Sequence, residues 1–314
     1  MENAKIAMAL YGEHNANLTH IEKHFDVSVS DRGNTLTIRG DQAEAAKHVF
    51  DLLLQKIESG KDYISSADID AELRFLGKEE KKMDENEKGE HRQFIKVKRK
   101  KIEARSPTQA SYIDNLDQKD MVFGIGPAGT GKTYLAVAKA VALYEDKMVE
   151  RMVFCRPAVE AGEKLGFLPG DMQDKIDPYL SPIYDALYDF LGKETAEKLL
   201  EKGDIEIAPL AFMRGRTLSD ACVILDEAQN TTSAQMKMFL SRMGDRSKMI
   251  ITGDPDQTDL PSNQISGLDE AIQILSGMDE VSFTRFSVED VVRHKLVAKI
   301  LRAYDKFKAK TQPA

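Results

Sequence analysis

The chain has 314 residues, of which 42% are hydrophobic and 31% are charged, and its formal net charge is −8. This length exceeds one average domain and predicts two. The longest apolar runs cover only five or six residues, as at 221–225, which excludes a membrane-spanning helix. The first residues lack the charged-then-apolar pattern of a secretory signal, so we expect a cytoplasmic protein without membrane attachment.

The acidic balance argues against a positive field over the whole surface, although a local basic groove can exist within an acidic chain. The two cysteines, Cys155 and Cys222, each lie inside an apolar strand-like run. This setting favours buried thiols in a reducing compartment over a disulfide or a metal site.

Residues 1–62 form the first predicted domain. Residues 27–30 and 36–39 alternate apolar and polar side chains around the turn Asp31-Arg-Gly-Asn34, which predicts a β-hairpin. One helix is predicted to end near Phe25, before the hairpin. Another is predicted over 42–57, because its apolar side chains recur at helical spacing. The order indicates a small α+β domain.

Residues 63–104 are predicted to be a charged linker that ends in a basic strand. The run 78–92 is dense in charge and almost without core-forming side chains, which is typical of a solvated segment. Residues 95–102 alternate, and their lysines fall on one side of a predicted strand. Residues 105–314 then alternate apolar strands with helical patterns, which predicts an α/β domain with a parallel sheet.

A glycine-rich loop follows the apolar run 121–125 and precedes a strongly helical segment. The pattern G-x-x-x-x-G-K-T between a strand and a helix predicts a phosphate-binding P-loop. Its backbone N–H groups would surround the phosphates of ATP at a helix N-terminus, a lysine would add a fixed positive charge, and a threonine hydroxyl would suit Mg²⁺. The loop residues are Gly126, Pro127, Ala128, Gly129, Thr130, Gly131, Lys132 and Thr133.

A second apolar strand, 221–225, ends in two acidic residues. Asp226 is the candidate carboxylate for Mg²⁺, and Glu227 is the candidate base for the attacking water. Because acidic residues also favour helix N-caps, this pair gains its meaning from the P-loop.

A third apolar strand, 248–252, runs into Gly253-Asp254-Pro-Asp-Gln257. The end of this strand should lie beside the γ-phosphate, where Gln257 or Asp254 could sense hydrolysis. An ordinary turn is the alternative, since Gly-Asp-Pro is common turn chemistry.

Taken together, these motifs resemble the PhoH-like family of P-loop ATPases, which share the core of superfamily I helicases. The resemblance covers nearly the whole chain and depends most on the segments 156–171, Asp177-Pro-Tyr, Asp226-Glu-Ala-Gln-Asn230 and Asp290-Val-Val-Arg-His294. It is closest to the cytoplasmic branch whose members carry an N-terminal KH-like module. It implies a RecA-like core with a parallel sheet, a small α+β KH-like domain, and an ATPase tied to RNA that works with an endoribonuclease or in ribosome maturation.

The resemblance also implies roles for single residues. Gln109 matches the helicase glutamine that reads the adenine edge, although a glutamine at a helix start after a proline is the simpler alternative. Gln229 and Asn230 match an extension of the acidic motif, and Gly253, Asp254 and Gln257 match the phosphate sensor. Arg293, on a helix expected to start near Ser287, and Arg156 are candidates for the cation that meets the γ-phosphate, with a salt-bridged or solvent-facing arginine as the alternative.

Two expectations concern assembly and RNA. Translocating helicases of this type place one nucleotide between two cores, and this chain has one, so we expect a homo-oligomeric ring, hexameric by family analogy, in which Arg293 reaches the neighbouring ATP. The KH-like module carries Gly12-Glu-His-Asn15 in place of G-x-x-G, which leaves RNA binding and a docking role equally open. The lysines at 96, 98, 100 and 101 could contact an RNA backbone or simply form a solvated edge.

Three functions therefore compete. The first is an RNA-dependent ATPase or helicase-like remodeller that binds single-stranded RNA. The second is a P-loop phosphotransferase, against which the acid beside the metal ligand favours water as acceptor. The third is a nucleotide-switched scaffold that recruits a nuclease.

Overall fold

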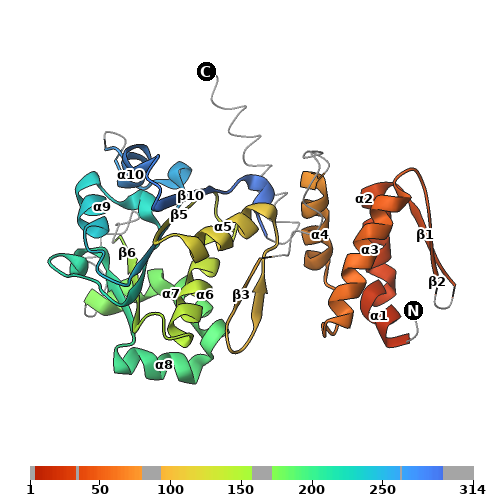
Figure 1. Ribbon diagram of the computed structural model, residues 1–314, viewed down its shortest axis with the longest axis horizontal. Coiled ribbons are helices and arrows are strands. Elements are labelled where there is room, and N and C mark those ends of the chain that lie inside the picture. The colour runs from red at the N-terminus through yellow and green to blue at the C-terminus, as the bar shows by residue number, and fades with distance from the viewer. Residues whose placement is uncertain (1–3, 33–34, 80–92, 158–171, 262–263, 293–314) are drawn as a thin grey trace, which may run out of the picture. The chain divides into compact units, whose positions relative to one another are not determined.

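The computed structural model describes residues 4–32, 35–79, 93–157, 172–261 and 264–292 (Figure 1). The chain divides into two compact units, one formed by Met1–Glu90 with Arg105–Pro107 and the other by His91–Ala104 with Thr108–Ala314. Each unit is described by itself below.

The N-terminal unit is an α+β unit built around one antiparallel hairpin, β1 (Ser28–Arg32) with β2 (Thr35–Arg39). Four helices accompany the hairpin in the described part of this unit: α1 (Ala4–Tyr11), α2 (Ala16–Phe25), α3 (Ala43–Glu58) and α4 (Ser66–Glu79). Their apolar faces share one core, which includes Leu18, Ile21, Val49 and Leu53. Residues 66–79, which were predicted to be part of a charged linker, instead form a helix of this unit, because their apolar side chains pack into the same core.

The turn between α1 and α2 is Gly12-Glu-His-Asn15, the segment that stands in place of a KH clamp. Gly12, His14 and Asn15 have positive φ values of 71°, 51° and 58°. Asparagine tolerates this left-handed conformation better than most residues, which explains how the turn forms without a second glycine. The buried amide of Asn17 donates hydrogen bonds to the carbonyls of Leu10 and Ile64, both at 2.9 Å, and holds the turn in place.

The second unit contains a parallel sheet of six strands in the order β10-β5-β9-β8-β6-β7. This observation confirms the predicted α/β fold with a RecA-like P-loop core. Strand β9 lies between the P-loop strand β5 and the acidic strand β8, so the ends of all three strands meet at one edge. The strands are β5 (Met121–Ile125), β6 (Arg151–Arg156), β7 (Ile205–Pro209), β8 (Ala221–Leu225), β9 (Lys248–Gly253) and β10 (Val281–Arg285).

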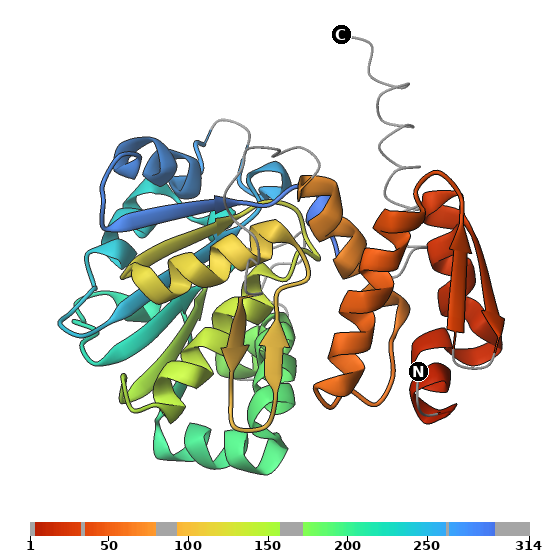
Figure 2. The same cartoon turned by 45° about the vertical axis from the view of Figure 1, so that its right-hand side comes forward.

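Helices cover both faces of this sheet, which is why its central strands are apolar at successive positions. Alternate strand residues, among them Phe123, Val223 and Ile251, pack against α9 (Ser233–Leu240) and α10 (Gly267–Leu275). The opposite face is covered by α5 (Pro107–Gln118) and α6 (Lys132–Glu145), as Figure 2 shows. The helices α7 (Met172–Leu191) and α8 (Lys193–Lys202) lie in the connection from β6 to β7.

A small antiparallel hairpin, β3 (Phe94–Lys96) with β4 (Lys101–Glu103), belongs to the same unit and contacts α6. Short 3₁₀ turns follow several strands, namely Leu210–Met213, Ala228–Asn230, Pro255–Gln257 and Val288–Asp290. Within the described ranges, none of the helices combines the length and the apolar character needed to cross a membrane.

The sequence predicted a helix that starts near Ser287, and the structure corrects this prediction. Residues 288–290 form a single 3₁₀ turn, closed by hydrogen bonds that Ser287 and Asp290 exchange as a capping box. The chain then leaves the helical path, and the N–H of Val292 donates to the carbonyl of Gly129 at 2.9 Å. Arg293 and His294 lie outside the described residues, as does most of the motif 156–171.

Candidate nucleotide-binding site

The P-loop connects the end of β5 with the start of α6. Three of its glycines have positive φ values, 136° at Gly126, 82° at Gly129 and 86° at Gly131. These conformations turn the backbone tightly enough to direct N–H groups toward a shared centre at the helix N-terminus. The Lys132 ammonium donates to the carbonyls of Gly126 at 2.5 Å and Pro127 at 2.8 Å. The loop is therefore already curled around its lysine.

Asp226 lies directly after β8 and faces the P-loop. Its Oδ1 accepts a hydrogen bond from the hydroxyl of Thr133 at 2.7 Å and another from the hydroxyl of Thr252 at 2.7 Å. Only 5% of Asp226 is exposed, so these donors stabilise a carboxylate that would otherwise be costly to bury. The two hydrogen bonds join the start of α6 with the ends of β8 and β9 at one carboxylate oxygen.

Glu227 follows Asp226 with a left-handed backbone, φ 54°, which is rare for a residue with a side chain. Strained conformations of this kind persist only where neighbouring contacts hold them. One carboxylate oxygen lies 3.2 Å from the Arg156 guanidinium, and the other accepts a hydrogen bond from the Gln229 amide. The structure thus brings Arg156, a residue from the end of β6, to the acidic pair.

The loop after β9 completes this end of the site. Gln257 donates its amide to Oδ2 of Asp254 at 2.7 Å, and the N–H of Asp254 donates to Oε1 of Gln229 at 3.0 Å. The Gln229 amide also lies 3.3 Å from the carbonyl of Gln257, which it can reach as a donor. Gln229 therefore connects Glu227 with the third strand end.

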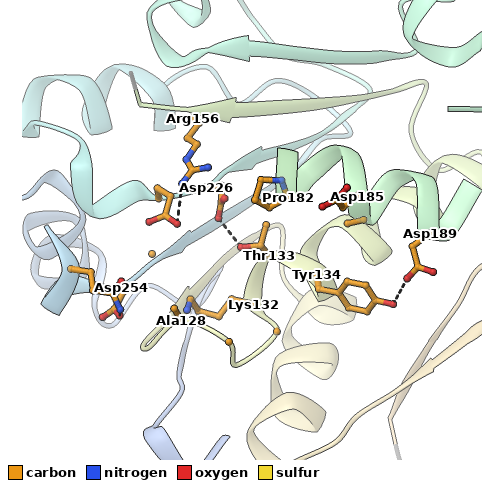
Figure 3. A pocket seen from close by; sticks show the side chains of 16 residues that line it. Ala128, Lys132, Thr133, Tyr134, Arg156, Pro182, Asp185, Asp189, Asp226 and Asp254 are labelled. Carbon is orange, nitrogen blue, oxygen red and sulfur yellow. Dashed lines mark hydrogen bonds and ion pairs between the residues drawn. The ribbon is translucent and has the colours of Figure 1, made fainter. Parts of the chain in front are cut away.

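A single cavity of about 620 Å³ gathers these groups (Figure 3). One end holds Arg156, Glu227, Asp254 and Gln257, and the middle holds the P-loop with Asp226. The other end is formed by Tyr134 of α6 with Asp185 and Asp189 of α7, and Pro182 and Ala186 of α7 also line the cavity. An elongated cavity of this kind fits a nucleotide whose phosphates lie over the P-loop.

The middle of the cavity contains two oxygen groups that can act as metal ligands. The Thr133 hydroxyl and the Asp226 carboxylate are the ligands that Mg²⁺ prefers, and Mg²⁺ usually takes only one or two protein groups and completes its shell with phosphate and water. The residues present therefore fit a magnesium ion bound together with a triphosphate.

The end of the cavity beside α7 is not apparent from the sequence. The Tyr134 hydroxyl donates to Oδ2 of Asp189 at 2.7 Å, and the Lys100 ammonium, from the β3–β4 hairpin, contacts both groups. Partial burial alone would raise the pKa of Asp189, but hydrogen bonds from Lys100 and Tyr134 outweigh it and lower that pKa below its usual value. The only local signal for this cluster is an aromatic residue directly after the P-loop threonine.

Gln109 was predicted to contact adenine, but in this structure its side chain contacts the P-loop backbone. Only 4% of the residue is exposed, its amide donates to the carbonyl of Thr130 at 2.9 Å, and it is not among the residues that line the cavity. The Gln109 side chain therefore stabilises the P-loop through its backbone. Recognition of adenine by this residue stays a prediction.

Residues 101–305 match the protein family described as PhoH-like protein. The chain belongs to the PhoH-like family. It is 48% identical to the PhoH-like protein of Bacillus subtilis over 308 residues, which cover 98% of this chain and 96% of the relative. It is 44% identical to the PhoH-like protein of Synechocystis over 313 residues, with 98% and 94% covered.

A third relative, Protein PhoH of Escherichia coli, is 45% identical over 205 residues, which cover 65% of this chain and 58% of the relative. The PhoH-like family is a nucleotide-binding family, and ATP is the nucleotide that this membership suggests. Membership therefore agrees with the cavity, in which the P-loop and the acidic strand end face each other.

Proposed function

We propose that this PhoH-like protein hydrolyses ATP with Mg²⁺ and couples the hydrolysis to binding or remodelling of RNA in the cytoplasm. One observation carries the hydrolytic part of the proposal. The hydroxyl of Thr133 and the carboxylate of Asp226 are in direct contact across the P-loop, with Glu227 beside them. A metal ligand pair next to a second carboxylate suits phosphoryl transfer to water, because that carboxylate can orient and deprotonate the attacking water.

In this proposal the P-loop N–H groups and the Lys132 ammonium bind the phosphates, and Thr133 and Asp226 hold Mg²⁺. When bound, the metal neutralises charge on the β- and γ-phosphates. Lys132 would exchange its hydrogen bonds with the carbonyls of Gly126 and Pro127 for contacts with phosphate oxygens. The loop geometry need not change for this exchange.

Glu227 is the candidate general base. Its carboxylate is held toward the cavity by Arg156 and Gln229, so its direction is set before a nucleotide arrives. Gln229 also contacts the loop that carries Asp254 and Gln257. The candidate base and the candidate phosphate sensor would therefore respond to the γ-phosphate together.

The RNA part of the proposal depends on the family resemblance and on the single core. One core leaves one side of the nucleotide open, and a neighbouring subunit could supply the missing cation, for which Arg293 is the candidate. An endoribonuclease would be the partner of such an RNA-tied ATPase.

The test is the rate of phosphate release with and without single-stranded RNA. We expect turnover that needs Mg²⁺ and rises several-fold with RNA, and we expect Lys132→Ala to abolish it, because removing the ammonium leaves the phosphates without their fixed counter-charge. Turnover that persisted in Lys132→Ala would assign the activity to another site or to a contaminant.

A second function, the nucleotide-switched scaffold, is favoured by one observation. Glu227 is engaged by Arg156, and a base held in an ion pair activates water slowly until that pair opens. Turnover that is slow and indifferent to RNA, together with tight ATP binding, would support the scaffold over the RNA-driven ATPase.

A further inference from the structure

The β3–β4 hairpin has one apolar face and one basic face. Ile95 and Ile102 are paired across the strands, and both are buried. The neighbouring pairs, Phe94 with Glu103 and Lys96 with Lys101, point the other way, and Phe94, Lys96 and Lys101 are exposed. The alternation places the hairpin's charges on its outer face.

The charge of this hairpin is opposite to that of the chain. Residues 93–103 carry five cationic side chains and one carboxylate, a net charge of +4, whereas the whole chain carries −8. The remaining residues together therefore carry −12. The cationic side chains are Lys96, Lys98, Arg99, Lys100 and Lys101.

The pairing of Lys96 with Lys101 is unfavourable for the hairpin itself. Like charges directly opposite each other on one face destabilise an antiparallel pair. A fold that needed only solubility could alternate the signs. Lys101 also pairs with Glu103 on this face at 3.1 Å, but the face keeps an excess of positive charge toward solvent, as a surface for a polyanion does.

An exposed aromatic ring lies within the same face. Phe94 is 45% exposed, and the Lys101 ammonium lies 4.1 Å from the centre of its ring. Lysines that can meet phosphates, with a ring on which a base can stack, are the combination that binds single-stranded nucleic acid. An acidic peptide would use the charge but would not need the ring.

The hairpin is also attached to the nucleotide cavity. Beyond the basic face, the Lys100 ammonium donates to the Tyr134 hydroxyl at 2.8 Å and pairs with Asp189, and both partners line the cavity. The backbone N–H of Lys98 donates to the Glu145 carboxylate at the end of α6, at 2.7 Å. Figure 3 shows the hydrogen bond between Tyr134 and Asp189 at this end of the cavity, so displacement of the hairpin would disturb both residues directly.

The geometry points to the outer face of the hairpin, formed by Phe94, Lys96, Lys98 and Lys101, as a contact surface for single-stranded RNA, with Lys100 connecting that surface to the nucleotide cavity. This inference rests on the proposed RNA-coupled ATPase and names where the RNA would bind. RNA on the hairpin would change the contacts at Tyr134 and Asp189, and nucleotide at that end of the cavity would change the hairpin.

The test of the surface is the triple variant Lys96→Glu, Lys98→Glu and Lys101→Glu in the full chain. None of these lysines lines the cavity, so basal ATP turnover should stay within about twofold of wild type. The affinity for a fluorescein-labelled oligouridine, measured by anisotropy, should fall at least about tenfold. The slope of log affinity against log salt should shrink by roughly 2, because each lost phosphate contact on a single strand contributes about 0.7.

A matched control reverses three other exposed lysines of the same unit, Lys193, Lys198 and Lys237, and makes the same change in net charge. Oligouridine should bind this control with nearly the wild-type affinity. If both triple variants lost the same affinity for oligouridine, binding would depend only on net charge, and the proposed contact surface would be wrong.

The connection through Lys100 has its own test. Lys100→Met should bind oligouridine within about threefold of wild type and should lose most of the RNA stimulation of ATP turnover, since the remaining basic residues still meet phosphate. Full stimulation in Lys100→Met would overturn the connection.

The remaining outcomes separate this inference from the proposed function. If wild type binds oligouridine and the hairpin triple variant binds it equally well, the surface is wrong and the RNA-coupled ATPase stands. If wild type neither binds oligouridine nor is stimulated by it, both fail. Tighter binding of oligothymidine than of oligouridine would assign the surface to DNA instead. If the hairpin triple variant lost binding to phosphatidylserine vesicles but not to oligouridine, the surface would be assigned to a membrane.

Discussion

Glu227 combines three unusual properties at the scale of a single residue: a left-handed backbone, an ion pair with Arg156 and a position beside a metal-type carboxylate. A residue in this conformation is strained by about 1–3 kcal/mol, and the surrounding contacts must compensate. Holding a carboxylate in one direction is useful when it must meet a water molecule.

Replacing Glu227 with glutamine tests this reading. Because the amide keeps the size of the side chain but cannot take a proton, we expect ATP binding to persist and turnover to fall by about 10²–10⁴-fold. Binding by calorimetry and single-turnover hydrolysis would measure the two effects. Glu194→Gln, at an exposed position of α8, is the matched control, and normal turnover in Glu227→Gln would remove Glu227 from the role of base.

At the scale of elements, the P-loop is enclosed by the segment that follows β10. The N–H of Gly126 donates to the carbonyl of Gly253 at 3.0 Å, and a side chain at Gly126 would come within 2.3 Å of the carbonyl oxygen of Phe286. The same segment reaches Gly129 through the N–H of Val292 at 2.9 Å. The loop is therefore shaped by the strand ends on both sides as well as by its own glycines.

Gly126→Ala should for this reason affect stability and binding together. A side chain at φ 136° costs about 1–3 kcal/mol before any overlap with Phe286 is counted. We expect a lower denaturation midpoint and weaker ATP binding. Gly203→Ala, where φ is 83° and the space is open, should cost about 1 kcal/mol and leave binding unchanged. Equal stability losses with normal binding in both variants would contradict this account of the loop.

At the scale of the whole molecule, one α/β core serves one nucleotide. The cavity opens beside the ends of β6, β8 and β9, and among the described residues that line it Arg156 is the arginine near Glu227, so we expect a further cation at the γ-phosphate from another subunit. Arg156 already pairs with Glu227. This arrangement is the physical reason to expect a ring, with Arg293 of one subunit near the ATP of the next.

Light scattering of the purified chain should accordingly give the mass of a homo-oligomer, and a hexamer of the 35.1-kDa chain by family analogy. Arg293→Ala should keep the oligomer and lose turnover, because the guanidinium acts on the transition state of a neighbouring site. Lys237→Ala is a suitable control at an exposed position. A monomer with full ATPase activity would contradict the expectation of a ring.

Much of the site could be predicted from the sequence because each of its motifs consists of residues close together in the chain. The P-loop is eight consecutive residues whose glycines dictate the backbone, and the acids at 226 and 227 and the loop at 253–257 each follow an apolar strand. Parallel strands bring their carboxyl ends to one edge, so the sequence alone was enough to predict an α/β fold with these three segments side by side. The strand order placed β9 between β5 and β8, which no local pattern encodes.

Other parts were decided only by the tertiary structure. Lys100 and Asp189 are 89 residues apart, and their contact depends on how the hairpin packs against α6 and α7. The hydrogen bond from the Gln109 amide to the carbonyl of Thr130 likewise depends on the packing of α5, and contact of this residue with a base stays a prediction. Contacts between residues distant in the chain depend on the packing of whole elements, whereas a glycine-rich loop carries its conformation in its own residues.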